Sequence, residues 1–162
     1  MTAEHVIEAF RDVNAIVACA ESLTGGMLCS ELVSVPGASA VVAGGVVAYA
    51  TEAKASVLGV DVDVLADHGP VSADVAVQMA ERVAGLFDAE FGIATTGVAG
   101  PESVGEHPVG EVYIAVSRHG ADTVVQRFVF DGERADIRRA AVAAALEMLA
   151  GAVRNGVSEP RD

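Results

Sequence analysis

Residues 15–26 read AIVACAESLTGG, and this stretch decides the class of fold. Ala15–Ala20 is an uninterrupted apolar run, which is the pattern of a parallel strand buried on both faces. The turn Thr24-Gly25-Gly26 then leads into a segment with apolar residues at helical spacing. A buried strand followed at once by a helix is the building unit of α/β folds.

The same alternation continues outward along the chain. The expected strands are 15–20, 45–50 and 91–96, with an antiparallel hairpin of 111–117 and 123–130. The expected helices are 4–13, 27–36, 51–59 with Thr51 as N-cap, 72–88, and about 135–153. These elements predict a three-layer α/β/α sandwich with a mixed, mostly parallel sheet of about five strands. We expect a single domain over 1–162, in which 155–162 is a loose tail.

Composition narrows the possible functions. Hydrophobic residues make up 52% and charged residues 20%, which excludes intrinsic disorder. Charges or glycines interrupt every apolar run before the roughly 18 residues of a membrane span, and the N-terminus lacks the bases of a secretory signal. We therefore expect a cytoplasmic protein with no membrane partner. An apolar-rich chain with little charge on its helices also predicts a homo-oligomer.

The net charge of −13 argues against nucleic acid as a partner. Such a surface repels phosphate backbones, and five Phe and two Tyr offer few platforms for base stacking. A small anionic ligand therefore needs a local site that works against the overall field.

Lys54 is the only lysine, because nine of the ten basic residues are Arg. A desolvated Lys can lose its proton and act as a base, which Arg cannot do. Tyr49 lies five positions earlier, near the same strand-to-helix corner. Ser22 and Ser39 each precede a small-residue helical start, and a neutral Lys54 could activate either as a nucleophile. Ordinary helix capping explains both serines equally well.

Three loops follow predicted strands, at 21–26, 49–54 and 95–110, where α/β folds bind ligands. The amides of Thr24-Gly25-Gly26 and of the 95–101 loop could hold an anion, although plain tight turns are as plausible. Arg134, before the last helix, could add a contact to phosphate. Neither loop matches a Walker or dinucleotide-binding fingerprint, so neither ATP nor a dinucleotide cofactor is expected.

The histidines and cysteines do not show the spacing of a metal site. The four histidines lie in separate segments without ligand spacing. Cys19 and Cys29 sit in apolar surroundings, which is typical of small core residues rather than of a disulfide framework or a zinc site.

Seven stretches, in order, resemble the CinA C-terminal domain family, whose enzymatic members are nicotinamide mononucleotide deamidases. They are AESLTGG at 20–26, VPGAS at 35–39, GGVVAYATEAKASVLGV at 44–60, HGPVS at 68–72, TTGVAGP at 95–101, PVGEVYIAV at 108–116 and FDGERADIRR at 130–139. The resemblance implies an α/β/α fold and hydrolysis of the nicotinamide carboxamide to nicotinate mononucleotide and ammonia. It also implies a Ser/Lys dyad with neither metal nor cofactor.

Carried over by position, the resemblance makes Ser39 the nucleophile, Lys54 the general base and Tyr49 an assistant in proton movement, with Ser22 as the other candidate nucleophile. The residues implied to contact the substrate are Glu21, Thr24, Gly25, Gly26, Thr96, Gly97, Gly100 and Arg134, the last at the phosphate.

This chain departs from the family pattern in the 102–107 loop. The family has Asp-Gly-Gly after GVAGP and ends in Lys-Pro-Val-Gly, whereas this loop is about one residue shorter and has His107 before Pro108. The altered loop motivates an alternative hypothesis, a non-catalytic nucleotide-binding or regulatory module.

Overall fold

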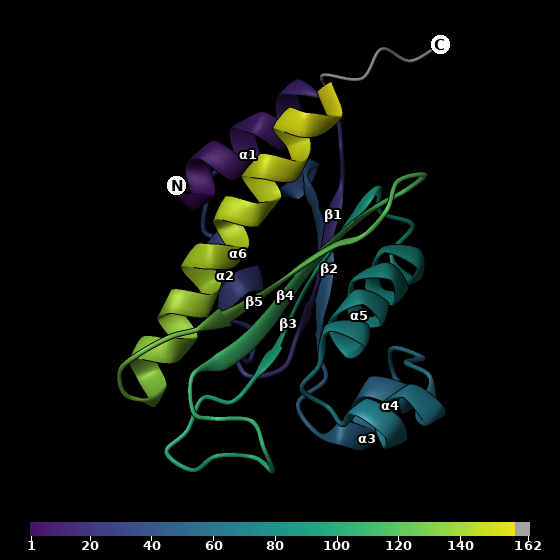
Figure 1. Ribbon diagram of the computed structural model, residues 1–162. Coiled ribbons are helices and arrows are strands. Elements are labelled where there is room, and N and C mark those ends of the chain that lie inside the picture. Colours follow the sequence, from purple (N-terminus) through teal and green to yellow (C-terminus); the bar gives the residue numbers. More distant parts are fainter. Residues whose placement is uncertain (158–162) are drawn as a thin grey trace.

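The apolar run of the opening stretch becomes the strand β1 (Val17–Glu21), buried along its whole length. The computed structural model describes residues 1–157 and places β1 inside a five-stranded sheet (Figure 1). The other strands are β2 (Val42–Val47), β3 (Phe91–Gly97), β4 (Glu111–Arg118) and β5 (Val124–Val129). The order is β2-β1-β3-β4-β5, where β1 runs parallel to β2 and β3 while β4 and β5 complete the sheet antiparallel.

Helices cover both faces of the sheet and confirm the predicted three-layer sandwich (Figure 1). One layer holds α1 (Ala3–Asp12), α2 (Met27–Val33) and α6 (Arg134–Val157), which contact one another. The opposite face is covered by α5 (Ala73–Leu86), beside which lie the short helices α3 (Thr51–Ser56) and α4 (Val62–His68). A 3-10 turn, η1 (Ala38–Ala40), precedes β2.

The two faces of the sheet carry side chains of different size. Under α1, α2 and α6 the strands present large residues such as Ile93 and Ile114. Under α5 they present alanines, among them Ala20 and Ala94. Small residues let α5 lie close to the sheet, so a Cβ at Gly92 would come within 1.9 Å of the backbone oxygen of Ala80. Burial of these two cores supplies the main driving force for folding.

Element boundaries differ from the prediction at several places. β2 begins three residues earlier than expected, because Gly44 and Gly45 interrupt an apolar pattern that continues on both sides. Thr51 is the first residue of α3 rather than its N-cap. The helix α4 was not predicted; the side chain of Asp61 caps it by accepting from the amide of Asp63.

The C-terminal end also differs. α6 continues through Val157, so residues 155–157 are helical rather than part of a loose tail, and 158–162 lie outside the described residues. Within residues 1–157, no helix is both long and apolar enough to cross a membrane.

Candidate active site

Lys54 and Ser22 meet at the carboxyl ends of β1 and β2. Ser22 follows β1 directly, and its amide continues the sheet by donating to the backbone oxygen of Thr95 at 3.0 Å. Lys54 lies in α3 and donates from Nζ to Ser22 Oγ at 2.9 Å and to the backbone oxygen of Ala48 at 3.0 Å. Its side chain is 1% exposed, yet no carboxylate pairs with it among the described residues. A cationic amine is unfavourable in such surroundings.

Burial therefore lowers the pKa of Lys54 from 10.5 to about 8. Near neutral pH a useful fraction of the amine is unprotonated, and its nitrogen lies within proton-transfer distance of a hydroxyl. The pair is thus chemically able to generate a serine nucleophile without histidine.

Glu21 organises the turn that carries Ser22. The carboxylate is buried and accepts from three backbone amides, at Gly26 (3.1 Å) and Leu28 (3.0 Å) through Oε2 and at Cys29 (2.8 Å) through Oε1. The first turn of α2 therefore already holds an anion supplied by the chain itself. Glu21 and the Gly26 amide thus satisfy each other within the chain, while substrate contact by Glu21 and anion binding by the Thr24-Gly25-Gly26 turn stay predictions.

Some of the remaining backbone amides of this turn donate hydrogen bonds within the chain, and others do not. Gly25 donates to the backbone oxygen of Ser22, and Met27 donates to that of Thr24. Among the described residues, the amides of Leu23 and Thr24 have no hydrogen-bond acceptor. They adjoin Ser22 and are the donors still available for a developing oxyanion.

A second group of predicted residues meets at the rim of the site. Arg134 donates from Nη1 to the backbone oxygen of Gly100 at 2.6 Å and from Nη2 to the hydroxyl of Tyr49 at 2.9 Å. Both Arg134 and Tyr49 are exposed, so the guanidinium retains contact with solvent. These contacts join α6, the loop after β3 and the segment after β2.

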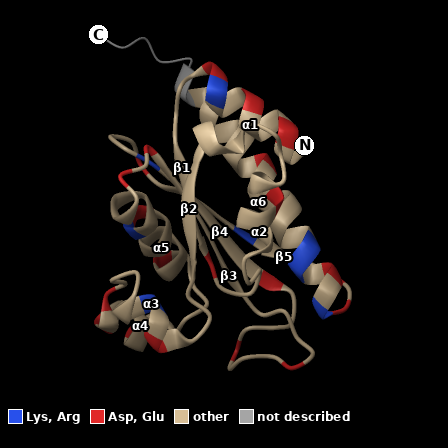
Figure 2. Ribbon diagram, turned by 180° about the vertical axis from the view of Figure 1, so that it is seen from behind, with Lys and Arg blue, Asp and Glu red and all other residues tan. Residues whose placement is uncertain are grey.

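Arg138 was not singled out from the sequence. Its guanidinium donates from Nε to the backbone oxygen of Leu23 at 2.9 Å and from Nη2 to that of Thr24 at 3.2 Å. It thereby fastens the Ser22 turn to α6. The available signal was its spacing of four residues from Arg134, which places both on one helical face. Figure 2 shows blue bands of arginine on these first turns of α6, interleaved with red ones, and Arg139 there pairs with Asp136.

Ser39 is not brought to Lys54. It lies in η1 and is exposed, at the amino end of β2. β2 separates it from the corner at which Lys54 sits, a span of about 20 Å for a strand of this length. Within one chain Lys54 therefore contacts Ser22 and lies far from Ser39, and the identity of the nucleophile stays a prediction.

The other predicted substrate contacts have structural partners of their own. Thr24 and Thr95 share a hydrogen bond at 2.7 Å between their buried hydroxyls, and the Thr96 hydroxyl donates to the backbone oxygen of Pro70 at 2.7 Å. A Cβ at Gly97 would lie 2.5 Å from the backbone oxygen of Glu111, so this glycine permits the close approach of β3 to β4. Gly100 adopts a φ of +84° and presents its oxygen to Arg134.

The altered loop after β3 is fastened at its far end. His107 Nδ1 contacts Glu111 Oε2 at 2.5 Å, and Arg127 Nε donates to Glu111 Oε1. Burial raises the pKa of Glu111, but the hydrogen bonds from Arg127 and His107 outweigh it and hold the pKa below its usual value. His107 is half-buried.

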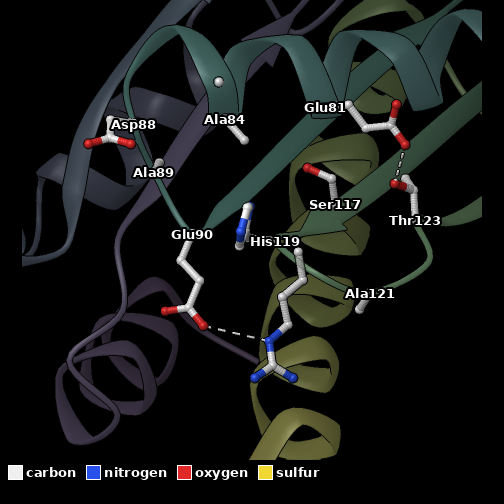
Figure 3. A pocket seen from close by; sticks show the side chains of 11 residues that line it. Glu81, Ala84, Asp88, Ala89, Glu90, Ser117, His119, Ala121 and Thr123 are labelled. Atoms are coloured by element: carbon white, nitrogen blue, oxygen red, sulfur yellow. Dashed lines mark hydrogen bonds and ion pairs between the residues drawn. The ribbon is translucent and has the colours of Figure 1, made fainter.

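Two hollows flank the sheet at opposite ends. One of about 620 Å³ is lined by the loop after β3 and by the start of α6, including Arg134 and Arg138. The other, of about 470 Å³, lies between the end of α5 and the β4–β5 turn, around Ser117 and His119 (Figure 3). Only the first holds residues predicted for the site. Across residues 1–157, no cluster of three or more His, Cys, Asp or Glu side chains is arranged to hold a metal ion.

Comparisons with known proteins agree with this architecture. The profile of the CinA C-terminal domain matches residues 1–153. A CinA-like protein of Frankia casuarinae is 49% identical over 137 residues, covering 84% of this chain and 31% of its own. One from Gemmatimonas aurantiaca is 46% identical over 142 residues, covering 87% and 32%. The chain therefore spans about a third of the length of these relatives.

Solved structures give the same result. The competence/damage inducible protein CihA from Agrobacterium tumefaciens superposes with a TM-score of 0.89 at 38% identity, covering 94% of this chain and 93% of its own. A CinA superfamily protein from Klebsiella pneumoniae gives a TM-score of 0.90 at 32% identity, covering 94% and 96%. On the matching profile, the relatives and the shared fold, this chain belongs to the CinA C-terminal domain family.

Proposed function

We propose that this protein is an amidohydrolase that converts nicotinamide mononucleotide to nicotinate mononucleotide and ammonia through a Ser22–Lys54 dyad. The observation that carries the proposal is the 2.9 Å contact between Lys54 Nζ and Ser22 Oγ, with a buried amine. The substrate follows from the motifs shared with deamidases of the family. The names of the relatives, CinA-like and competence/damage inducible, specify no reaction.

In the proposed reaction, neutral Lys54 takes the proton of Ser22 as Oγ attacks the carboxamide carbon. The protonated amine then gives this proton to the leaving ammonia, which breaks the C–N bond and leaves an acyl-enzyme. Water attacks the ester, with Lys54 again as base, and releases the carboxylate. The hydrogen bond to the backbone oxygen of Ala48 keeps Lys54 Nζ beside Ser22 during acylation and deacylation.

The oxyanion requires donors near Ser22. The free amides of Leu23 and Thr24 suit this role, because the amide that follows a nucleophile is a common oxyanion donor. Each such donor contributes on the order of 3 kcal/mol to transition-state stabilisation. Arg138 holds the carbonyls of the same two residues, which fixes the direction of the peptide groups in the turn.

The phosphate of the substrate fits the hollow beside α6. Its volume of about 620 Å³ lies in the range of small-molecule sites, and it presents Arg134 and Arg138. Arg138 adjoins both this hollow and the Ser22 turn, so one ligand could bridge them. Local arginines overcome the unfavourable field of a chain with net charge −13.

The decisive experiment incubates the purified protein with nicotinamide mononucleotide in the absence of metal and measures ammonia and nicotinate mononucleotide. We expect stoichiometric release of both products. Nicotinamide riboside and free nicotinamide serve as controls and should react at least tenfold more slowly, because they lack the phosphate. Thermal stabilisation by the nucleotide without product would contradict catalysis and favour the binding-module alternative.

The pH dependence of the reaction should report Lys54. Because only the neutral amine is a base, we expect kcat/KM to rise about tenfold per pH unit below the pKa near 8 and to level above it. A plateau already reached at pH 6 would exclude Lys54 as the base.

Unfolding gives an independent measure of the same pKa. The folded pKa lies below the unfolded value, so between about pH 8 and 10.5 the unfolded state binds more protons and stability from this group rises with pH. Relative to Lys54→Met, the wild type should gain on the order of 3 kcal/mol across that window. A constant difference between the two proteins would contradict the lowered pKa.

A further inference from the structure

Cys19 and Cys29 both pack against one glycine of the neighbouring strand, Gly45. Cys19 lies in β1 and pairs with Gly45 of β2, while Cys29 lies in α2, which packs over these strands. A Cβ built on Gly45 would lie 3.1 Å from Cys29 Sγ and 3.3 Å from Cys19 Cβ. Both cysteines are therefore packed around the same glycine, and both are free thiols.

The two thiols differ in access to solvent and in acidity. Cys19 is fully buried, whereas Cys29 is half-buried and lies beside the exposed Gly45. A hydrogen bond between the thiols lowers the pKa of Cys29 to about 7, against the opposing effects of burial and of Glu21. The same hydrogen bond, together with burial, raises the pKa of Cys19. The accessible sulfur is thus also the better nucleophile near neutral pH.

We propose that Cys19 and Cys29 form a reversible redox site, oxidised by hydroperoxides to a disulfide between β1 and α2. The Cys29 thiolate attacks a peroxide oxygen, so that an S–O bond forms, the O–O bond breaks and the peroxide leaves as alcohol or water. Cys19 then attacks the sulfur of the Cys29 sulfenic acid. The S–S bond forms, the S–O bond breaks, and hydroxide leaves with the Cys19 proton as water.

The cross-link would act on the turn that carries Ser22. Cys19 and Cys29 bracket this turn in sequence, and the Cys29 amide is one of the donors that hold Glu21. Drawing the two sulfurs together shifts α2 against β1, where Glu21 fixes the turn. This second step rests on the proposed function, whereas the redox site itself does not.

The test uses the chain's own cleavage sites. No glutamate lies within 9–20 or 22–30, so Glu-specific proteolysis separates Cys19, in fragment 9–21, from Cys29, in fragment 22–31. After treatment of the folded protein with hydrogen peroxide, we expect a loss of about 2 Da in intact mass and joined fragments that dithiothreitol separates. The matched variant Cys19→Ala should instead gain oxygen at Cys29, and Cys29→Ala should stay unmodified.

If fragments 9–21 and 22–31 of the oxidised wild type are not joined, the proposed disulfide is wrong, whether or not either variant folds. In the same samples, oxidised wild type should hydrolyse nicotinamide mononucleotide at least tenfold more slowly, and dithiothreitol should restore the rate. An unchanged rate in cross-linked protein would overturn the link to Ser22. Absence of hydrolysis by the reduced protein would instead count against the proposed function and leave the mass result as it stands.

Discussion

Replacing Lys54 by arginine should lower kcat/KM for nicotinamide mononucleotide by about 1,000-fold or more, in the range that general bases contribute together with nucleophile activation. Arginine keeps the positive charge and can still donate to Ser22, but it stays protonated at every workable pH. The variant therefore separates the role of a proton acceptor from that of a charge or a hydrogen-bond donor.

Lys54→Met is the matched control for folding, because methionine fills a similar volume without a buried charge. It should be as inactive as the arginine variant while its free energy of unfolding at pH 7 is not lowered. If Lys54→Arg unfolds because guanidinium does not fit a site with 1% exposure, the methionine variant still tests the base. Turnover by Lys54→Met within tenfold of wild type would contradict the mechanism.

Ser22→Ala should also reduce turnover by about 1,000-fold or more, because it removes the proposed nucleophile. Ser39→Ala should stay within twofold of wild type in rate. Ser39 is exposed and lies at the other end of β2, so its replacement should change stability by less than about 0.5 kcal/mol. Steady-state rates of the two variants, with circular dichroism for folding, make the comparison direct.

The reverse result would be equally clear. If Ser39→Ala abolishes turnover and Ser22→Ala does not, the Ser22–Lys54 dyad is wrong. Because Ser39 is remote from Lys54 within one chain, a second copy would then have to supply it, and mixing Ser39→Ala with Lys54→Arg protein should restore activity. Restoration by mixing would thus contradict a Ser22–Lys54 dyad within one chain.

The sequence by itself determined the layers of the fold. The apolar run 15–20, the helical spacing in 72–88 and the alternation in 111–130 reflect local burial, which is written into the order of residue types. Predictions were least accurate where the pattern of apolar residues is weak. These places are the edge strand β2, with its two glycines, and the short helix α4. Lys54 was also identifiable, because a lone lysine among arginines stands out in composition.

The tertiary structure decided which residues lie together. Strand patterns do not show a strand's direction or its neighbours, so the sequence could not show which of Ser22 and Ser39 lies beside Lys54. The parallel pairing of β1 with β2 brings the carboxyl ends together, joins Ser22 to Lys54 and sends Ser39 to the opposite edge. The roles of Glu21 and Arg138 have the same origin, since each depends on backbone atoms that only folding brings within hydrogen-bonding distance. Residue types and their periodicity can be read from the sequence. A site depends on distances between residues that are remote in sequence, and only folding fixes those distances.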